Sequence, residues 1–197
     1  MLPPTPFDPW SRTTAGTRLF IARGSVSSPE KGGTVSAASS LERFYRLWGP
    51  PTLRFRAHLP FYPSCTIQLF DEARVGAPIR IFHGTADDWT PIAPCREYVA
   101  RLQSASVDAR MIELPSVFHA FDVPTLPGSL YLPKVQNGAR CRVVERAPGD
   151  FVDPETGRPA VSGGPCVGLG ATVGYNASAR RVAAAAVKEF LRTTLTP

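Results

Sequence analysis

The chain has 197 residues, of which 43% are hydrophobic, and this is sufficient for one domain with a buried core. Its 22 Lys and Arg outnumber its 16 Asp and Glu, but the basic residues are scattered, so we expect no nucleic-acid partner. We also expect no membrane partner, because no apolar run approaches the roughly 20 residues of a membrane span and residues 1–10 lack the pattern of a secretory signal.

The N-terminal part of the chain predicts a loose terminus followed by a strand. Residues 1–17 are rich in proline, serine and threonine and follow no period, so we expect them to precede a single domain over residues 18–197. Residues 18–23, with the sequence RLFIAR, predict a short buried strand, and Gly24 begins a turn-rich stretch.

A helix is predicted over Thr34–Trp48, where apolar residues recur every three or four positions and form one apolar stripe. The stripe comprises Val35, Ala38, Leu41, Phe44 or Tyr45, and Trp48. Gly49 and the two prolines after it end this helix. A strand is then predicted over Arg54–Tyr62.

The middle of the chain carries catalytic residue types in a recognisable order. A buried strand is predicted at Ile79–Phe82, followed by a turn with Asp87, and a second strand at Ala109–Leu114, followed by His119; a helix over Ile92–Leu102 separates them. An acid and then a histidine, each just past the carboxyl end of a strand, is how a parallel α/β sheet presents the last two members of a catalytic triad. The nucleophile should therefore lie upstream.

Two motifs in this region resemble those of the dienelactone hydrolase family of α/β-hydrolases. The family's acid turn reads H-G-x-x-D-x-x-x-P, and HGTADDWTP stands here at residues 83–91. Its histidine loop reads x-H-x-F, and FHAF stands at residues 118–121. The sequence FYPSC at residues 61–65 is similar to the family's strand end between nucleophile and acid. The resemblance covers residues 19–122 and the last helix.

The resemblance implies a partial α/β-hydrolase sheet of about four parallel strands, flanked by helices. It also implies a hydrolase of a small ester or lactone that uses neither a cofactor nor a metal. Asp87 would be the catalytic acid and His119 the base that takes the proton of a Ser or Cys nucleophile, giving an acyl-enzyme that water cleaves. Asp88 fits a solvated turn residue or a helix-start charge, and His83 fits a structural role. His58 stands mid-strand, and the sequence indicates no partner for it.

The nucleophile motif is degenerate. In α/β-hydrolases the nucleophile stands in a sharp G-x-S-x-G turn between a strand and a helix. Counting back from the glycine pair at residues 32–33 places Glu30 at the nucleophile position. A register with a short insertion would place Ser27 or Ser28 there, and Ser28 lies nearer the glycines. The alternative is a loop whose serines only solvate a turn.

The resemblance is to the carboxyl-terminal half of the domain, because the chain has no room for the strands that precede the nucleophile strand in the family. The strand at Leu19 would then be an exposed sheet edge, open to self-association. Loss of an oxyanion donor costs about 100- to 1,000-fold in rate, so a truncated, inactive remnant that acts at most as a binding domain is the alternative function. Missing strands encoded upstream of Met1 would show that this is not the true start.

The four cysteines lack the spacing of a zinc site. Cys65 follows one predicted strand and Cys95 begins the helix after the next, whereas Cys141 and Cys166 bracket one irregular segment. We therefore predict the disulfides Cys65–Cys95 and Cys141–Cys166. Paired cysteines would imply a periplasmic or secreted protein, and reduced cysteines a cytoplasmic one.

Residues 123–175 are rich in proline and glycine and follow no regular pattern, so we predict an insertion beside His119 that shapes or covers a pocket. The alternative is a peripheral excursion. A small hairpin of Arg142–Glu145 with Ala160–Val161 is predicted within it, with residues 154–157 as its turn. A last helix begins after Asn176, its cap, and should pack on the sheet. Its apolar face comprises Ala179, Val182, Ala183, Ala186, Val187, Phe190 and Leu191.

Overall fold

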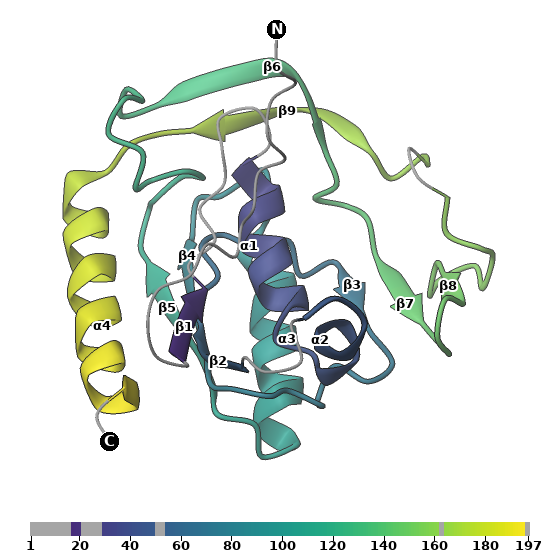
Figure 1. Cartoon of the computed structure of the whole chain (residues 1–197). Helices are drawn as coiled ribbons and strands as arrows, with labels where there is room; N and C mark the ends of the chain where they lie inside the picture. The colour runs from purple at the N-terminus through teal and green to yellow at the C-terminus, as the bar shows by residue number, and fades with distance from the viewer. Residues whose placement is uncertain (1–16, 21–28, 50–53, 162–163, 196–197) are drawn as a thin grey trace, which may run out of the picture.

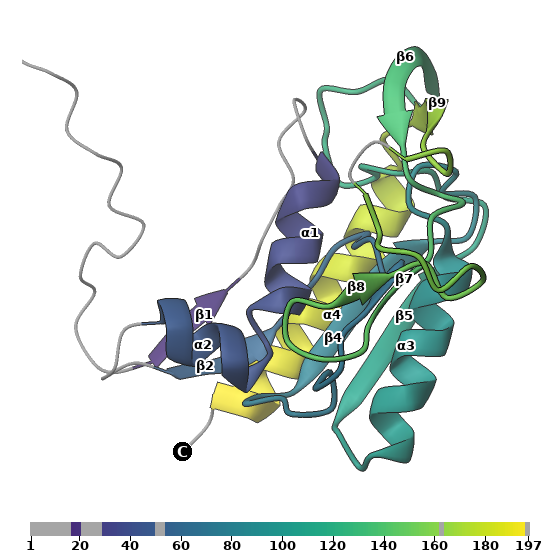
Figure 2. The same ribbon diagram turned by 90° about the vertical axis from the view of Figure 1, so that its right-hand side faces the viewer.

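The computed structural model describes residues 17–20, 29–49, 54–161 and 164–195. Its centre is a sheet of four parallel strands in the order β1-β2-β4-β5. These strands are β1 (Thr17–Phe20), β2 (Arg54–His58), β4 (Ile79–Gly84) and β5 (Ala109–Leu114). Helix α4 (Ala177–Leu195) covers one face of the sheet, and α1 (Pro29–Ala38) and α3 (Ile92–Ser104) lie on the other (Figure 1 and Figure 2). The α/β class and the partial parallel sheet are confirmed.

The pairing of β4 with β5 determines where the site forms. The two strands are in register along their whole length, from Ile79 opposite Ala109 to Gly84 opposite Leu114. Their carboxyl ends therefore lie side by side, and the segments that leave them are neighbours. Gly84 allows the loop after β5 to come close, because a side chain there would collide with the carbonyl of Val117.

The helix predicted over Thr34–Trp48 is two helices, α1 and α2 (Glu42–Trp48). The hydroxyls of Ser39 and Ser40 donate to backbone carbonyls three residues earlier, at 2.9 and 2.6 Å, which offers the backbone an alternative to a helix. The N–H of Glu42 donates to the carbonyl of Arg74 at 2.9 Å, so the chain is held away from its helical path. The break depends on this tertiary contact.

The predicted stripe of that helix is correct only in part. Leu41 and Tyr45 are buried, whereas Val35 is 52% exposed and Trp48 is 78% exposed. The stripe is interrupted because α2 starts in a new direction after the turn, so residues spaced for one helix no longer share a face.

Strand β2 ends at His58, before its predicted end at Tyr62. Pro60 has no N–H to give to a strand ladder, and Tyr62 adopts a φ of 39°. The chain still runs beside β4, because the N–H of Tyr62 donates to the carbonyl of Phe82 at 2.8 Å. This irregular end holds the Tyr62 side chain next to the site.

The nucleophile candidates are mostly outside the described residues. The strand predicted over residues 18–23 is present as β1, which the structure describes for Thr17–Phe20. Ser27 and Ser28 lie outside the described residues, as do residues 1–16 of the predicted loose terminus. Glu30 stands in the first turn of α1.

Four strands between residues 130 and 173, together with β3 (Ile67–Gln68), form two small sheets in the described part of the chain. Strands β6 (Leu130–Asn137) and β9 (Gly168–Val173) pair antiparallel in a ribbon that arches across one end of the molecule (Figure 1). The second sheet has the order β3-β7-β8, with β7 at Val143–Glu145 and β8 at Phe151–Val152. The sequence did not indicate β6 because Pro133 interrupts it, and the structure has a register shift there.

The predicted hairpin of Arg142–Glu145 with Ala160–Val161 is wrong in its second strand. Strand β7 pairs with β8 through a tight turn in which Gly149 adopts a φ of 82°, a conformation that favours glycine. Closing a short loop costs less chain entropy than closing a long one. Residues 154–157 form a turn as predicted, but this turn joins β8 to Pro159, which bridges to Val152 antiparallel.

The cap of the last helix is confirmed, and most of its predicted face packs on the core. The side-chain oxygen of Asn176 accepts a hydrogen bond from the N–H of Ala179 at 2.9 Å. Ala179 and Ala183 are buried, and four further members of the face contact the same core cluster. The prediction is wrong for Val182, which is 49% exposed.

Both predicted disulfides are confirmed. Cys65 bonds to Cys95 and Cys141 bonds to Cys166, with Cα–Cα distances of 4.9 Å in each pair. The first disulfide ties the segment after β2 to the start of α3, and the second joins the chain that leaves β6 to the chain that enters β9. None of the helices in the described ranges has the length and apolar character of a membrane span.

Candidate active site

The turn after β4 holds Asp87 in a fixed position. The N–H groups of Thr85 and Ala86 donate to carbonyls at and after the end of β5, at 2.9 and 3.1 Å. Asp87 Oδ1 accepts the N–H groups of Trp89 at 3.0 Å and Thr90 at 2.8 Å, just before α3 begins. An aspartate that accepts two backbone N–H groups cannot rotate freely, so its second oxygen points in one direction.

The loop after β5 carries His119 in a constrained backbone. Ser116 and Ala120, which flank it, have φ angles of 57° and 59°. The carbonyl of His119 accepts the N–H of Gly174 at 3.0 Å, and the residue bridges to Val173 in β9. Non-glycine residues in this backbone region persist only where surrounding contacts hold them. The backbone at His119 is therefore held in one conformation, which limits where the imidazole can lie.

Asp87 and His119 are in direct contact, and we refer to them as the dyad. Asp87 Oδ2 lies 2.8 Å from His119 Nδ1, and both side chains are fully buried. Because an ionised carboxylate only accepts hydrogen bonds, Nδ1 carries the proton and Nε2 has a free lone pair. Nε2 is buried without a partner among the described residues. This arrangement is that of a general base whose tautomer is set by an acid.

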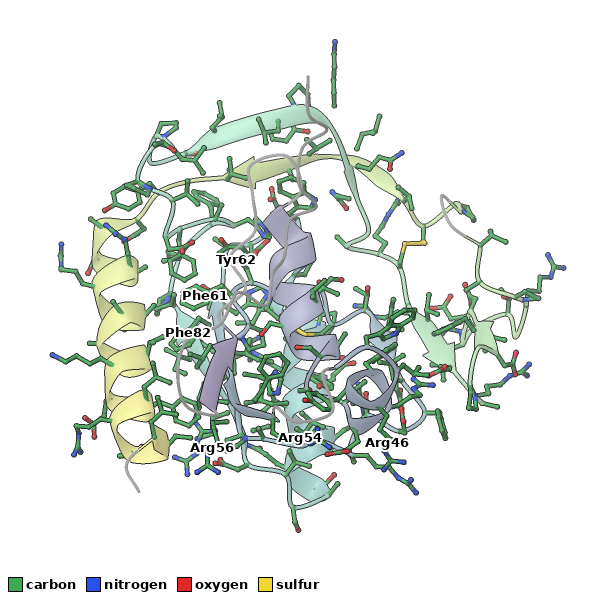
Figure 3. All side chains as sticks on the ribbon, in the orientation of Figure 1. Arg46, Arg54, Arg56, Phe61, Tyr62 and Phe82 are labelled. Carbon is green, nitrogen blue, oxygen red and sulfur yellow. A yellow bond between two sulfur atoms is a disulfide. The ribbon has the colours of Figure 1, made fainter. Side chains whose placement is uncertain are left out.

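Two aromatic rings enclose the imidazole of His119. The ring centroid of Tyr62 lies 4.4 Å away and that of Trp89 lies 5.1 Å away. The hydroxyl of Tyr62 donates to Asp122 Oδ1 at 2.9 Å, which fixes the ring from its other end. Figure 3 shows Tyr62 on the side of the molecule that faces the β6–β9 ribbon. The dyad thus lies in a packed aromatic environment.

The two other histidines are held neutral. Burial lowers the pKa of His58 to about 4, and burial also lowers the pKa of His83. His83 Nδ1 lies 3.1 Å from the carbonyl of Gly84. The position of His83 agrees with the structural role expected for it.

Several residues of the site were missed by the sequence interpretation. Asp88, expected as a solvated turn residue or a helix-start charge, is exposed, and it also accepts hydrogen bonds from the backbone N–H and hydroxyl of Thr172, at 2.7 and 2.8 Å. Thr90 Oγ1 lies 3.0 Å from Asp87 Oδ2. The available signal was position, since both residues stand inside the acid-turn motif.

The structure brings together Asp87 and His119, and their catalytic roles stay a prediction. The first turns of α1, with Glu30, lie near the same end, because Thr34 Oγ1 accepts the N–H of Ser64 at 3.0 Å beside the Tyr62 segment. In the described part of the chain, no group of three or more His, Cys, Asp or Glu side chains is placed to hold a metal ion.

Comparisons with known proteins agree with this geometry at the level of the family. The model of the dienelactone hydrolase family matches residues 50–195, about three quarters of the chain. A search of the curated proteins found none that matches.

Solved structures similar to this chain include two enzymes. One is a dienelactone hydrolase-like promiscuous phosphotriesterase from metagenomic libraries, with 13% identity, a TM-score of 0.44, and coverage of 71% of this chain and 43% of that one. Another is a thermophilic esterase from the planctomycete Thermogutta terrifontis with propionate bound, with 18% identity, a TM-score of 0.36, and coverage of 46% and 43%. This chain thus matches less than half the length of either structure. Because the family model matches most of its length, the chain belongs to the dienelactone hydrolase family.

Proposed function

We propose that this protein hydrolyses a small ester or lactone through an acyl-enzyme, with Asp87 and His119 as its acid and base. The observation that carries the proposal is the buried contact between Asp87 Oδ2 and His119 Nδ1, which leaves Nε2 unpartnered among the described residues. Membership of the dienelactone hydrolase family supports the reaction class.

The chemistry follows from the protonation state of the dyad. His119 Nε2 accepts the proton of a hydroxyl nucleophile as its oxygen attacks the ester carbonyl, and Asp87 stabilises the imidazolium that forms. The imidazolium then gives its proton to the departing alkoxide, and an acyl-enzyme remains. Water attacks the acyl-enzyme with Nε2 again as the base, which releases the carboxylic acid and restores the nucleophile.

Ser28 is the first candidate for the nucleophile, and Ser27 is the second. Both precede α1, in the order that the family's strand, nucleophile and helix follow. We expect Ser28→Ala to remove the acyl-enzyme, detected as a mass increase of the intact chain after a rapid quench with p-nitrophenyl acetate. A mass increase that persists in Ser28→Ala and is lost in Ser27→Ala would assign the role to Ser27.

The direct test is hydrolysis of p-nitrophenyl acetate by the purified chain and by His119→Ala. We expect a loss of about 100- to 10,000-fold, because a positioned general base contributes that much. His58→Ala is the matched control, since imidazoles react slowly with this ester and His58 is a buried histidine on β2, outside the dyad. Equal rates for the parent chain and His119→Ala, both with the disulfides intact and after their reduction, would contradict the hydrolase.

The alternative is a truncated, catalytically inactive member of the family that acts at most as a binding domain. It is favoured by the complete burial of His119 and by a cavity of about 590 Å³ that lies elsewhere, along α4. Asp122, Arg180 and Lys188 are among its lining residues. Under this alternative, His119→Ala leaves the esterase rate unchanged. In either case the two disulfides favour an oxidising compartment, periplasmic or extracellular.

A further inference from the structure

The β6–β9 ribbon arches across one end of the molecule (Figure 1), and its Val173 bridges to His119. It is also hydrogen-bonded to the acid turn at two points. Asp88 binds the backbone N–H and hydroxyl of Thr172 in β9. Trp89 donates from Nε1 to the carbonyl of Gln136 in β6 at 3.1 Å, while its ring packs on His119. The residues that follow the catalytic acid in sequence therefore connect the dyad to the ribbon.

A disulfide closes the end of the ribbon that is remote from His119. The ribbon's Val173 end bridges to His119, whereas its other end, where Asn137 pairs with Gly168, continues into Cys141 and Cys166. Both of these cysteines are half-buried, whereas the other disulfide pairs the half-buried Cys65 with the fully buried Cys95. A dithiol therefore reaches the ribbon's disulfide more readily.

Most side chains of β6 in the ribbon face solvent. Its buried residues include the small side chains of Ala171 and Val173, whereas Tyr131 and Leu169 are 60% and 69% exposed. A two-stranded ribbon is marginally stable by itself, so its position depends on its fastenings. Beside this ribbon the imidazole of His119 has no exposed surface.

We propose that the β6–β9 ribbon is a cover, held closed over His119 by the Cys141–Cys166 disulfide and opened by a dithiol reductant. One thiolate of the reductant attacks a protein sulfur and releases the other protein sulfur as a thiolate. The reductant's second thiolate then attacks the mixed disulfide and releases the first protein sulfur. The protein gains two thiols, and the reductant leaves as a cyclic disulfide. The effect on activity rests on the proposed hydrolase function, because opening the cover would give a substrate access to Nε2.

The test is the rate at which diethyl pyrocarbonate acylates each histidine, measured by peptide mass spectrometry with and without dithiothreitol. The chain has three histidines, and each is at most 2% exposed, so background labelling is low. We expect reduction to speed labelling of His119 on the order of tenfold, because loss of the cross-link increases local opening. His58 serves as the internal reference, and its labelling should stay slow.

Two double variants separate the ribbon's disulfide from the other one. C141S/C166S should label rapidly at His119 without reductant and should show no further response to it. C65S/C95S should label slowly until dithiothreitol is added. Hydrogen exchange of residues 130–137 and 168–173 should rise in the first variant and on reduction of the parent chain.

Slow labelling of His119 after complete reduction would contradict the proposal that the ribbon is a cover held by the disulfide. Equal acceleration at His58 and His119 would overturn it too, because that outcome indicates loosening of the whole domain. Neither labelling nor exchange requires catalysis, so the cover and the hydrolase fail separately. Suppose that His119→Ala keeps the esterase rate, but reduction speeds the labelling of His119 in the parent chain. This result would support the cover and contradict the hydrolase.

Discussion

Thr90 contacts three groups of the site at once. Its Oγ1 lies 3.0 Å from Asp87 Oδ2, 3.1 Å from His119 Nδ1 and 3.2 Å from the carbonyl of Tyr62. It is buried, so its hydroxyl has no water to replace these partners. The hydroxyl therefore sets the separation between the acid turn and the Tyr62 segment, and in the proposed reaction it would act by positioning the dyad.

We expect Thr90→Val to lower the free energy of unfolding by about 1–3 kcal/mol, because it removes the hydrogen bond that the buried hydroxyl donates to the Tyr62 carbonyl or to Asp87 Oδ2. Urea denaturation measures this change. If the dyad is catalytic, kcat should fall while KM stays unchanged. Thr90→Ser keeps the hydroxyl and should retain most of both quantities, so equal losses in Val and Ser would show that packing alone matters.

His58 makes the stability of the protein depend on pH. Burial lowers its pKa from 6.5 to about 4, so between these values the unfolded chain binds more protons than the folded chain. Stability is therefore fully present above the unfolded pKa and falls as the pH drops towards 4. We expect His58 to make the free energy of unfolding about 2 kcal/mol lower at pH 5 than at pH 7, measured by urea denaturation. His58→Gln should flatten this slope, and an unchanged slope would contradict the assignment.

At the scale of elements, α4 depends on its first turn. Asn176 satisfies the N–H of Ala179, and α4 then packs Ala179 and Ala183 on the core. We expect Asn176→Ala to lower the free energy of unfolding by about 1 kcal/mol, measured by thermal or urea unfolding. Asn176→Ser supplies a cap oxygen again and should be nearly neutral. A neutral alanine variant would show that tertiary packing alone holds α4.

The sequence was informative where structure is local. The spacing of strand, acid turn, helix and strand placed Asp87 and His119 at the carboxyl ends of two neighbouring strands, because neighbouring parallel strands share their direction. The break after α1 was not visible, since it needs the contact between Glu42 and Arg74. The β6–β9 ribbon was missed for the same reason, because its two strands are separated by a long excursion and one contains Pro133.

At the scale of the whole molecule, the two edges of the parallel sheet differ. In the described residues β1 has β2 on one side only, and β5 is the other edge. Edge β5 carries the exposed charges Arg110 and Glu113, which discourage pairing with another chain. Arg46, Arg54 and Arg56 lie at the end of the molecule away from Tyr62 (Figure 3), so the basic surface there is remote from the dyad.

We expect any self-association to use β1. Sedimentation velocity should show a larger species as the protein concentration rises. Amide hydrogen exchange of residues 17–20 should slow over the same range, whereas exchange of residues 109–114 should not. A single monomeric species at every concentration would remove the prediction.

The two cross-links join consecutive cysteines, with separations of 30 and 25 residues, and their rings do not interleave. As the polypeptide emerges from the ribosome or a translocation channel, the first ring has both its sulfurs before those of the second appear. An oxidase that pairs thiols in order of arrival thus produces the native connectivity directly. We expect oxidative maturation of the nascent protein to proceed without an isomerase.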